Sequence, residues 1–147
     1  MKLVVCLGNP LVGDDAFGHL VAEELRRAGW EDVVVSGPDL APVISRLEEI
    51  DTLVLVDAVD WGSEPGDLLV RRLEEVEDES GLVSHSISPL KVVKTLRAVT
   101  GRPPRVYVVG VNPGRVGPGE GISEAVRRSV APAVSEILRI LRDPVRS

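Results

Sequence analysis

Five short runs of β-branched and other apolar residues lie along the chain, separated by helical or turn-forming segments. Three of these runs are almost wholly apolar, a pattern typical of strands that are covered on both faces of a sheet. The five runs occupy residues 3–7, 33–35, 53–56, 68–70 and 106–109. We predict that each forms a strand.

Apolar residues recur every three or four positions in several of the segments between these runs, which predicts amphipathic helices. One stripe runs from Phe17 to Ala28, and a shorter one includes Val43 and Ile50. Ser88-Pro89 is typical of a helix start, because serine caps backbone N–H groups and proline tolerates the first turn. The last helix is expected over residues 123–141.

Strands that alternate with helices predict a three-layer α/β/α fold around a mostly parallel sheet. The link over residues 58–66 is an exception, because it contains Gly62 and Pro65-Gly66 and is shorter than the dozen or so residues that a parallel crossover needs. We therefore expect a mixed five-stranded sheet whose fourth strand is antiparallel. No linker divides residues 1–147, so we expect one domain.

Charge and composition exclude some classes of partner. The formal net charge is −6, and the arginines are mixed with acids, which argues against nucleic acid binding. No stretch approaches the roughly 20 apolar residues that span a membrane. The single cysteine, Cys6, is expected to be a small buried residue of the first strand. A cytoplasmic protein is the simplest interpretation.

Acidic residues follow two of the predicted strands. Ligands of open α/β sheets bind outside the carboxyl ends of the strands. Asp14 and Asp15 lie in the segment after the first strand, where one of them is a candidate helix cap. Asp57 closes the apolar run 53–56, where an acid is costly unless it is paired or bound to a cation. Asp60 is interpreted as a turn residue.

The chain has two histidines, His19 and His85. His19 follows Asp15 by four positions and could share a helix face with it, whereas His85 lies in a polar segment. Two carboxylates and one imidazole suit a borderline divalent metal such as zinc, nickel or manganese. From the residues alone, the hypothesis is a metal-using α/β protein.

The order of the motifs resembles the hydrogenase maturation proteases. The first block runs from Gly8-Asn9 through Asp14-Asp15 to Gly18. The later blocks are Leu55-Val56-Asp57-Ala58-Val59-Asp60 with Pro65-Gly66, then Ser84-His85 with Pro89-Leu90, then Val109-Gly110-Val111 with Pro113, and finally Gly121-Ile122-Ser123. Together they cover nearly the whole chain.

This resemblance implies a twisted five-stranded sheet and a metal-dependent endopeptidase. It implies Asp15, Asp57 and His85 as metal ligands, with Asp15 and Asp57 as the catalytic carboxylates. The implied substrate is the precursor of a nickel–iron hydrogenase large subunit, cut near its C-terminus after nickel insertion. The implied metal is nickel, which arrives with that precursor and serves as its recognition signal.

Two other functions are compatible with the same residues. A nickel-binding chaperone or sensor would hold the precursor without cutting it, with the same ligands. A small-molecule hydrolase could also use this fold, since a fold does not fix a function. His19 and His85 both stay open as the third ligand.

Overall fold

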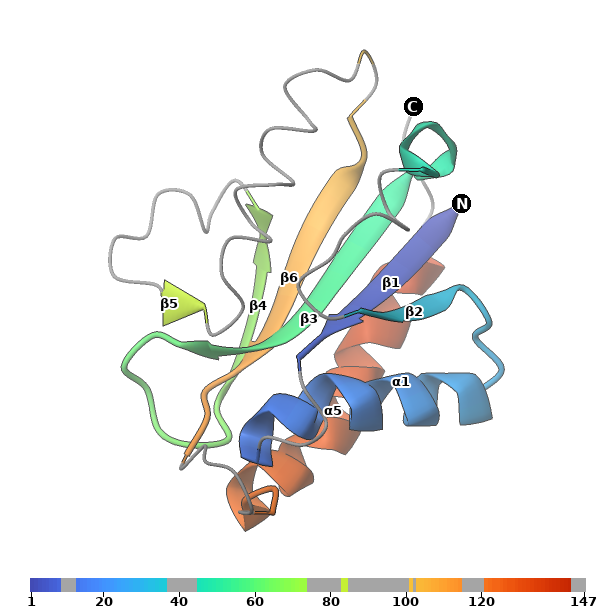
Figure 1. Ribbon diagram of the computed structural model, residues 1–147. Coiled ribbons are helices and arrows are strands. Elements are labelled where there is room, and N and C mark those ends of the chain that lie inside the picture. Colours follow the sequence, from blue (N-terminus) through green and yellow to red (C-terminus); the bar gives the residue numbers. More distant parts are fainter. Residues whose placement is uncertain are drawn as a thin grey trace.

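Residues 1–8, 13–36, 45–73, 83–84, 101, 103–114 and 121–143 are described by a computed structural model of the chain. Within these residues, one mixed sheet has the strand order β2-β1-β3-β6-β4 (Figure 1). Its strands are β1 (Lys2–Leu7), β2 (Val33–Ser36), β3 (Thr52–Asp60), β4 (Leu68–Arg72) and β6 (Arg105–Val111). All five predicted strands are therefore confirmed.

Strand directions also agree with the prediction. β1 is parallel to β2 and to β3, and β3 is parallel to β6. β4 is antiparallel to β6, and hence to β3. However, β6 lies between β3 and β4, so the link after β3 passes the end of β6 and does not form a hairpin.

β3 is longer than the predicted run, and Asp57 does not close it. The strand continues to Asp60 because β6 pairs with it as far as Ala58, opposite Val111. Beyond that point the two-residue strand β5 (Val83–Ser84) pairs antiparallel with Val59 and Asp60. The polar residue at position 57 is therefore inside a hydrogen-bonded strand.

Two helices, α1 (Phe17–Arg27) and α5 (Glu124–Arg142), pack against one face of the sheet (Figure 1). Their apolar stripes meet alternate strand residues in a core that includes Val4, Cys6 and Val56. Both helices agree with the predicted ranges within a few residues. Ser123 caps α5, since its hydroxyl oxygen accepts a hydrogen bond from the backbone N–H of Val126.

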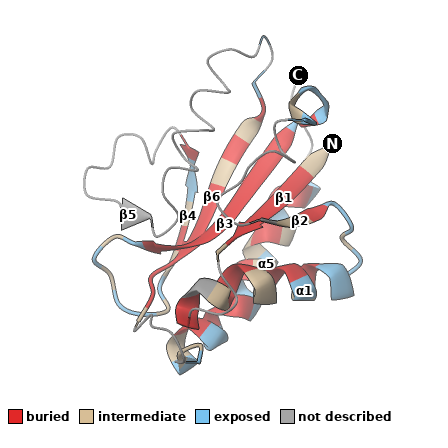
Figure 2. Ribbon diagram, in the orientation of Figure 1, coloured by how far each residue is buried: buried red, intermediate tan, exposed pale blue. Residues whose placement is uncertain are grey.

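Successive residues of β1 and β3 are buried, and these strands are red along most of their length in Figure 2, so the opposite face of the sheet is buried too. Alternate residues such as Leu3, Leu55 and Val108 form a second apolar cluster there. The predicted helix that begins at Ser88 lies outside the described residues. Of the predicted stripe at residues 43–50, the described part contains a single 3₁₀ turn, η2 (Leu47–Glu49). No described helix is long and apolar enough to cross a membrane.

Two glycines allow helices to approach the sheet closely. A Cβ at Gly18 would overlap the backbone carbonyl oxygen of Leu7, so glycine is needed where α1 begins against β1. Gly66 has a φ of +90°, and a Cβ there would overlap the backbone of Ala125 in α5. These contacts fix the N-terminal ends of both helices near the carboxyl ends of the parallel strands.

Candidate functional site

The strand order reverses between β1 and β3. The chain goes from β1 to β2 on one side and then returns to β3 on the other side of β1. Such a switch point is where open α/β sheets bind their ligands, outside the carboxyl ends of the strands. Gly8 follows β1 at this point, and the 3₁₀ turn η1 (Gly13–Ala16) lies against β3.

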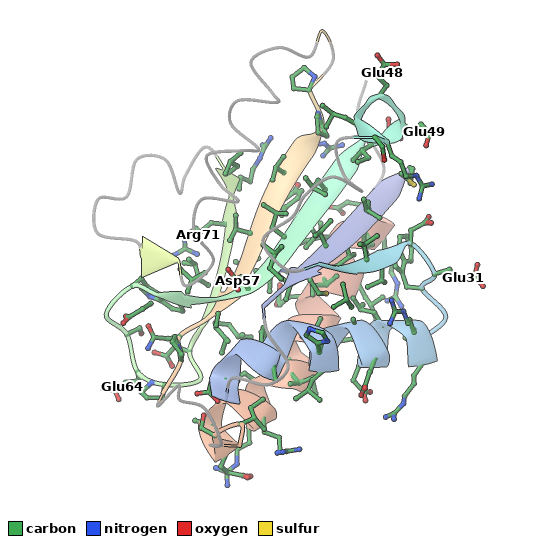
Figure 3. The ribbon with its side chains drawn as sticks, viewed as in Figure 1. Glu31, Glu48, Glu49, Asp57, Glu64 and Arg71 are labelled. Carbon is green, nitrogen blue, oxygen red and sulfur yellow. The ribbon has the colours of Figure 1, made fainter. Side chains whose placement is uncertain are left out.

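Asp57 lies at the same level of the sheet. Val56 is the last residue of β3 that pairs with β1, opposite Cys6, so Asp57 comes where β1 ends. The residue alternation along β3 turns its side chain to the face opposite α1 and α5. Figure 3 labels Asp57 on β3. The residue is only 3% exposed, and its Oδ1 accepts a hydrogen bond of 2.8 Å from the backbone N–H of Ala58.

Gly110 faces Asp57 across the strand pair. Because Gly110 has no side chain, β6 contributes nothing to fill the surface directly beside the Asp57 carboxylate. A Cβ at Gly110 would come within 3.2 Å of Val59. The space that a side chain at position 110 would fill is therefore taken up by the side chain of Val59.

The two adjacent aspartates, Asp14 and Asp15, lie in η1, directly before α1. The structure places the backbone of Asp15 in η1, at the carboxyl-end edge of the sheet to which Asp57 also belongs. Asp14 is fully buried, and its carboxylate accepts hydrogen bonds from Gly114 and Ser123. The prediction that one aspartate caps the first helix is wrong for Asp14, because the N-cap of α1 is Ala16 and no side chain caps it.

The two histidines lie in different parts of the fold. His85 lies outside the described residues, and Ser84, which precedes it, pairs with Val59 two residues beyond Asp57. His19 belongs to α1, which covers the face of the sheet opposite the Asp57 side chain. His19 therefore lies on the other side of the sheet from the Asp57 side chain.

Among the predicted ligands, Asp57 is the one whose side chain lies in the described part of the chain. Within that part, no three His, Cys, Asp or Glu residues are grouped so as to hold a metal ion. The donor set of Asp15, Asp57 and His85 nevertheless fits a borderline divalent cation, because it combines carboxylate oxygens with an imidazole nitrogen.

Cys6 is excluded as a nucleophile at neutral pH. Its side chain is buried in the core under α1, as predicted. Burial raises the pKa of its thiol to about 12, although the nearby Arg26 guanidinium acts in the opposite direction. The reactive thiolate is therefore scarce.

Asn112, a residue that the sequence analysis missed, organises the turn after β3. It is buried, and its Oδ1 accepts hydrogen bonds from the backbone N–H groups of Trp61 and Ser63, while its Nδ2 donates to the carbonyl oxygen of Ser63. The available signal was the same as for Asp57, a polar residue directly after an apolar run. The interpretation of Asp60 as a turn residue is wrong, because Asp60 is the last residue of β3 and pairs with Val83, although its carboxylate accepts a hydrogen bond from the N–H of Gly62 in the turn that follows.

A surface depression of about 370 Å³ lies elsewhere, between β4, β6 and the C-terminal end of α5. Its lining includes Arg72, Tyr107 and Arg139. These residues lie toward the amino end of β6, away from Asp57, so the expected chemistry does not use this depression.

Comparison with known proteins decides the family. The family model described as "HycI: Hydrogenase maturation protease" matches residues 19–140. The chain belongs to the hydrogenase maturation protease family. The matched range includes Asp57 and His85 and begins after Asp15.

Relatives in this family match almost the whole chain. The hydrogenase expression/formation protein HupM of Azotobacter chroococcum is 31% identical over 96% of this chain and 71% of its own length. The hydrogenase 2 maturation protease of Escherichia coli is 28% identical over 96% of this chain and 90% of its own length. Peptide-bond hydrolysis is therefore the activity of the chain.

Solved structures support the fold independently. The [NiFe] hydrogenase maturation protease HybD from Thermococcus kodakarensis superimposes with a TM-score of 0.83 over 97% of this chain and 100% of that one, at 24% identity. The mixed sheet and its helices therefore form the same fold as this maturation protease.

Proposed function

We propose that this maturation protease removes the C-terminal extension of a nickel–iron hydrogenase large-subunit precursor after nickel has been inserted. The observation that carries the proposal is the buried carboxylate of Asp57 at the switch point of a sheet with the maturation protease fold. An acid in that position is costly to bury unless a hydrogen-bond donor or a cation compensates it.

The proposed metal ligands are Asp15, Asp57 and His85. The switch point supports this set, because η1 lies against β3, and Ser84 pairs with β3 just beyond Asp57. Asp15 and Asp57 are the proposed catalytic carboxylates. Three protein ligands with two negative charges leave coordination positions for groups of the precursor.

In this mechanism nickel belongs to the substrate. The precursor presents its nickel to the two carboxylates and the imidazole, which recognise the metal and anchor the chain that carries it. A metal held there can also polarise the scissile carbonyl as a Lewis acid. The protein then positions the C-terminal extension of the precursor against the two carboxylates. We expect this reaction in the cytoplasm, where the precursor would be assembled.

The direct test is the mass of the precursor after incubation with the protein. Nickel-loaded precursor should lose its C-terminal peptide, and nickel-free precursor should stay intact, because it lacks the group that the ligands recognise. Equal cleavage of both forms would contradict substrate-borne nickel. Stable binding of loaded precursor without any mass change would instead indicate a chaperone or sensor.

A further inference from the structure

Asp14 joins two segments that are far apart in the sequence. Its Oδ1 accepts a hydrogen bond of 2.7 Å from the backbone N–H of Ser123, and its Oδ2 accepts bonds of 2.8 Å from the backbone N–H of Gly114 and from the Ser123 hydroxyl. The residue is 0% exposed. The η1 turn is thereby tied to the link between β6 and α5.

The chemistry of this tie is specific to a carboxylate. An ionised carboxylate only accepts hydrogen bonds, and all three partners of Asp14 are donors. Ser123 is the N-cap of α5, so the negative charge also lies at the positive end of a helix dipole. Hydrogen bonds to a charged acceptor are shorter and stronger than neutral ones.

The same link also holds the turn that follows β3. Asn112, two residues before Gly114, binds the backbone of Trp61 and Ser63 through its side chain. The segment 112–114 therefore contacts η1, which contains Asp15, through Gly114, and the turn that follows β3, the strand of Asp57, through Asn112. A shift of η1 would change the separation of these two aspartates.

We propose that Asp14 is a positioning residue, which holds the neighbouring Asp15 at its working distance from Asp57 through Gly114 and Ser123. This inference rests on the proposed function, because it assigns Asp14 a role only if Asp15 is a metal ligand. Groups that orient metal ligands typically change metal affinity or activity 10- to 100-fold when they are removed.

Asp14→Asn is the sharpest variant. Whichever way the amide is turned, its NH₂ group faces a backbone N–H, of Gly114 or of Ser123, so a donor meets a donor. Ser123→Ala is milder, because it removes the hydroxyl and leaves both backbone bonds. Ser129→Ala is the matched control: its buried hydroxyl ties α5 to Gly66 and does not contact η1.

Each variant is titrated with Ni²⁺ in a calorimeter and assayed on nickel-loaded precursor, at a temperature where circular dichroism shows it fully folded. We expect Asp14→Asn to weaken Ni²⁺ binding and lower kcat/KM by about 10- to 100-fold. Ser123→Ala should give a smaller loss of the same kind. Ser129→Ala should stay within about twofold of the wild type, even where its thermal unfolding midpoint falls.

A double-mutant cycle with Asp15→Asn distinguishes positioning from general damage. If Asp14 acts through Asp15, adding Asp14→Asn to Asp15→Asn should weaken Ni²⁺ binding no further. Additive losses, or wild-type Ni²⁺ affinity in folded Asp14→Asn, would overturn the inference and leave the proposed function standing. Wild-type Ni²⁺ affinity and cleavage in Asp15→Asn would overturn the ligand set and this inference together.

Discussion

Three polar side chains are buried near the switch point: Cys6, Asp14 and Asp57. The unfavourable free energy of their burial is offset in different ways. Cys6 stays neutral, because burial raises the pKa of its thiol. Asp14 is compensated by three donors from a distant part of the chain. Asp57 accepts a hydrogen bond from the next backbone N–H and lies beside a glycine. Both aspartates are therefore buried with hydrogen-bond donors beside them, and those of Asp14 come from a distant part of the chain.

The Cys6 thiol should make stability fall at alkaline pH. Its pKa is raised from 9.0 to about 12 in the folded protein. Above the lower value the unfolded thiol loses its proton and the folded one keeps it, so the unfolded state binds fewer protons and the free energy of unfolding falls as pH rises. The slope from this one group is about 1.4 kcal/mol per pH unit.

Urea unfolding at about pH 8 and about pH 10 measures this effect in wild type and in Cys6→Ala. Cys6→Ala is expected to have a lower free energy of unfolding than the wild type at both pH values, because the substitution leaves a small cavity. Between the two pH values, its free energy of unfolding should fall less than that of the wild type. Identical pH dependence in the two proteins would show that the thiol ionises equally in the folded and unfolded states.

Some residues of the candidate site could be predicted from the sequence and others could not. Asp57 stands out because a carboxylate directly follows an apolar run, a signal that needs no tertiary information. The partners of Asp14 could not be predicted, because they lie 100 and 109 residues away. The assignment of Asp15 and His85 as ligands came from the family resemblance, and it stays a prediction.

At the scale of elements, local sequence patterns predicted which segments form strands and in which direction β4 runs. They did not predict which strands lie next to each other in the sheet. The runs of β-branched residues gave all five strands of the main sheet, and the short link after β3 gave the direction of β4. The extension of β3 to Asp60 was missed, because it depends on pairing with β6 and β5. That pairing is set by chain segments far along the sequence.

The approach of α1 to β1 provides a test at this scale. Gly18→Ala should destabilise the protein by about 1–3 kcal/mol, because the new Cβ overlaps backbone atoms of Leu7 that cannot rotate away. Gly121→Ala is the control, since no atom of the described residues lies within 4 Å of a Cβ there, and it should change stability by less than about 0.5 kcal/mol. Urea unfolding of both variants measures the difference, and equal stabilities would contradict the close packing of α1.

For the whole molecule, the decisive feature is the topology that gathers separate segments at one edge of the sheet. The reversal of strand order between β1 and β3 leaves the end of β1, η1 and Asp57 together, and the link after β6 connects them to α5. Membership in the hydrogenase maturation protease family gives the chain its hydrolytic activity. In the proposed function, this edge recognises nickel through Asp57 when the protein cleaves a precursor.

Recognition of nickel by Asp57 is tested by the cleavage of nickel-loaded precursor by Asp57→Asn, with Asp60→Asn as the matched control. Both substitutions remove one negative charge from β3, but Asp60 is exposed and only supports the turn through the N–H of Gly62. We expect Asp57→Asn to fold and to leave the precursor at its full mass, while Asp60→Asn releases the C-terminal peptide as the wild type does. Wild-type processing by a folded Asp57→Asn variant would show that nickel is recognised without Asp57.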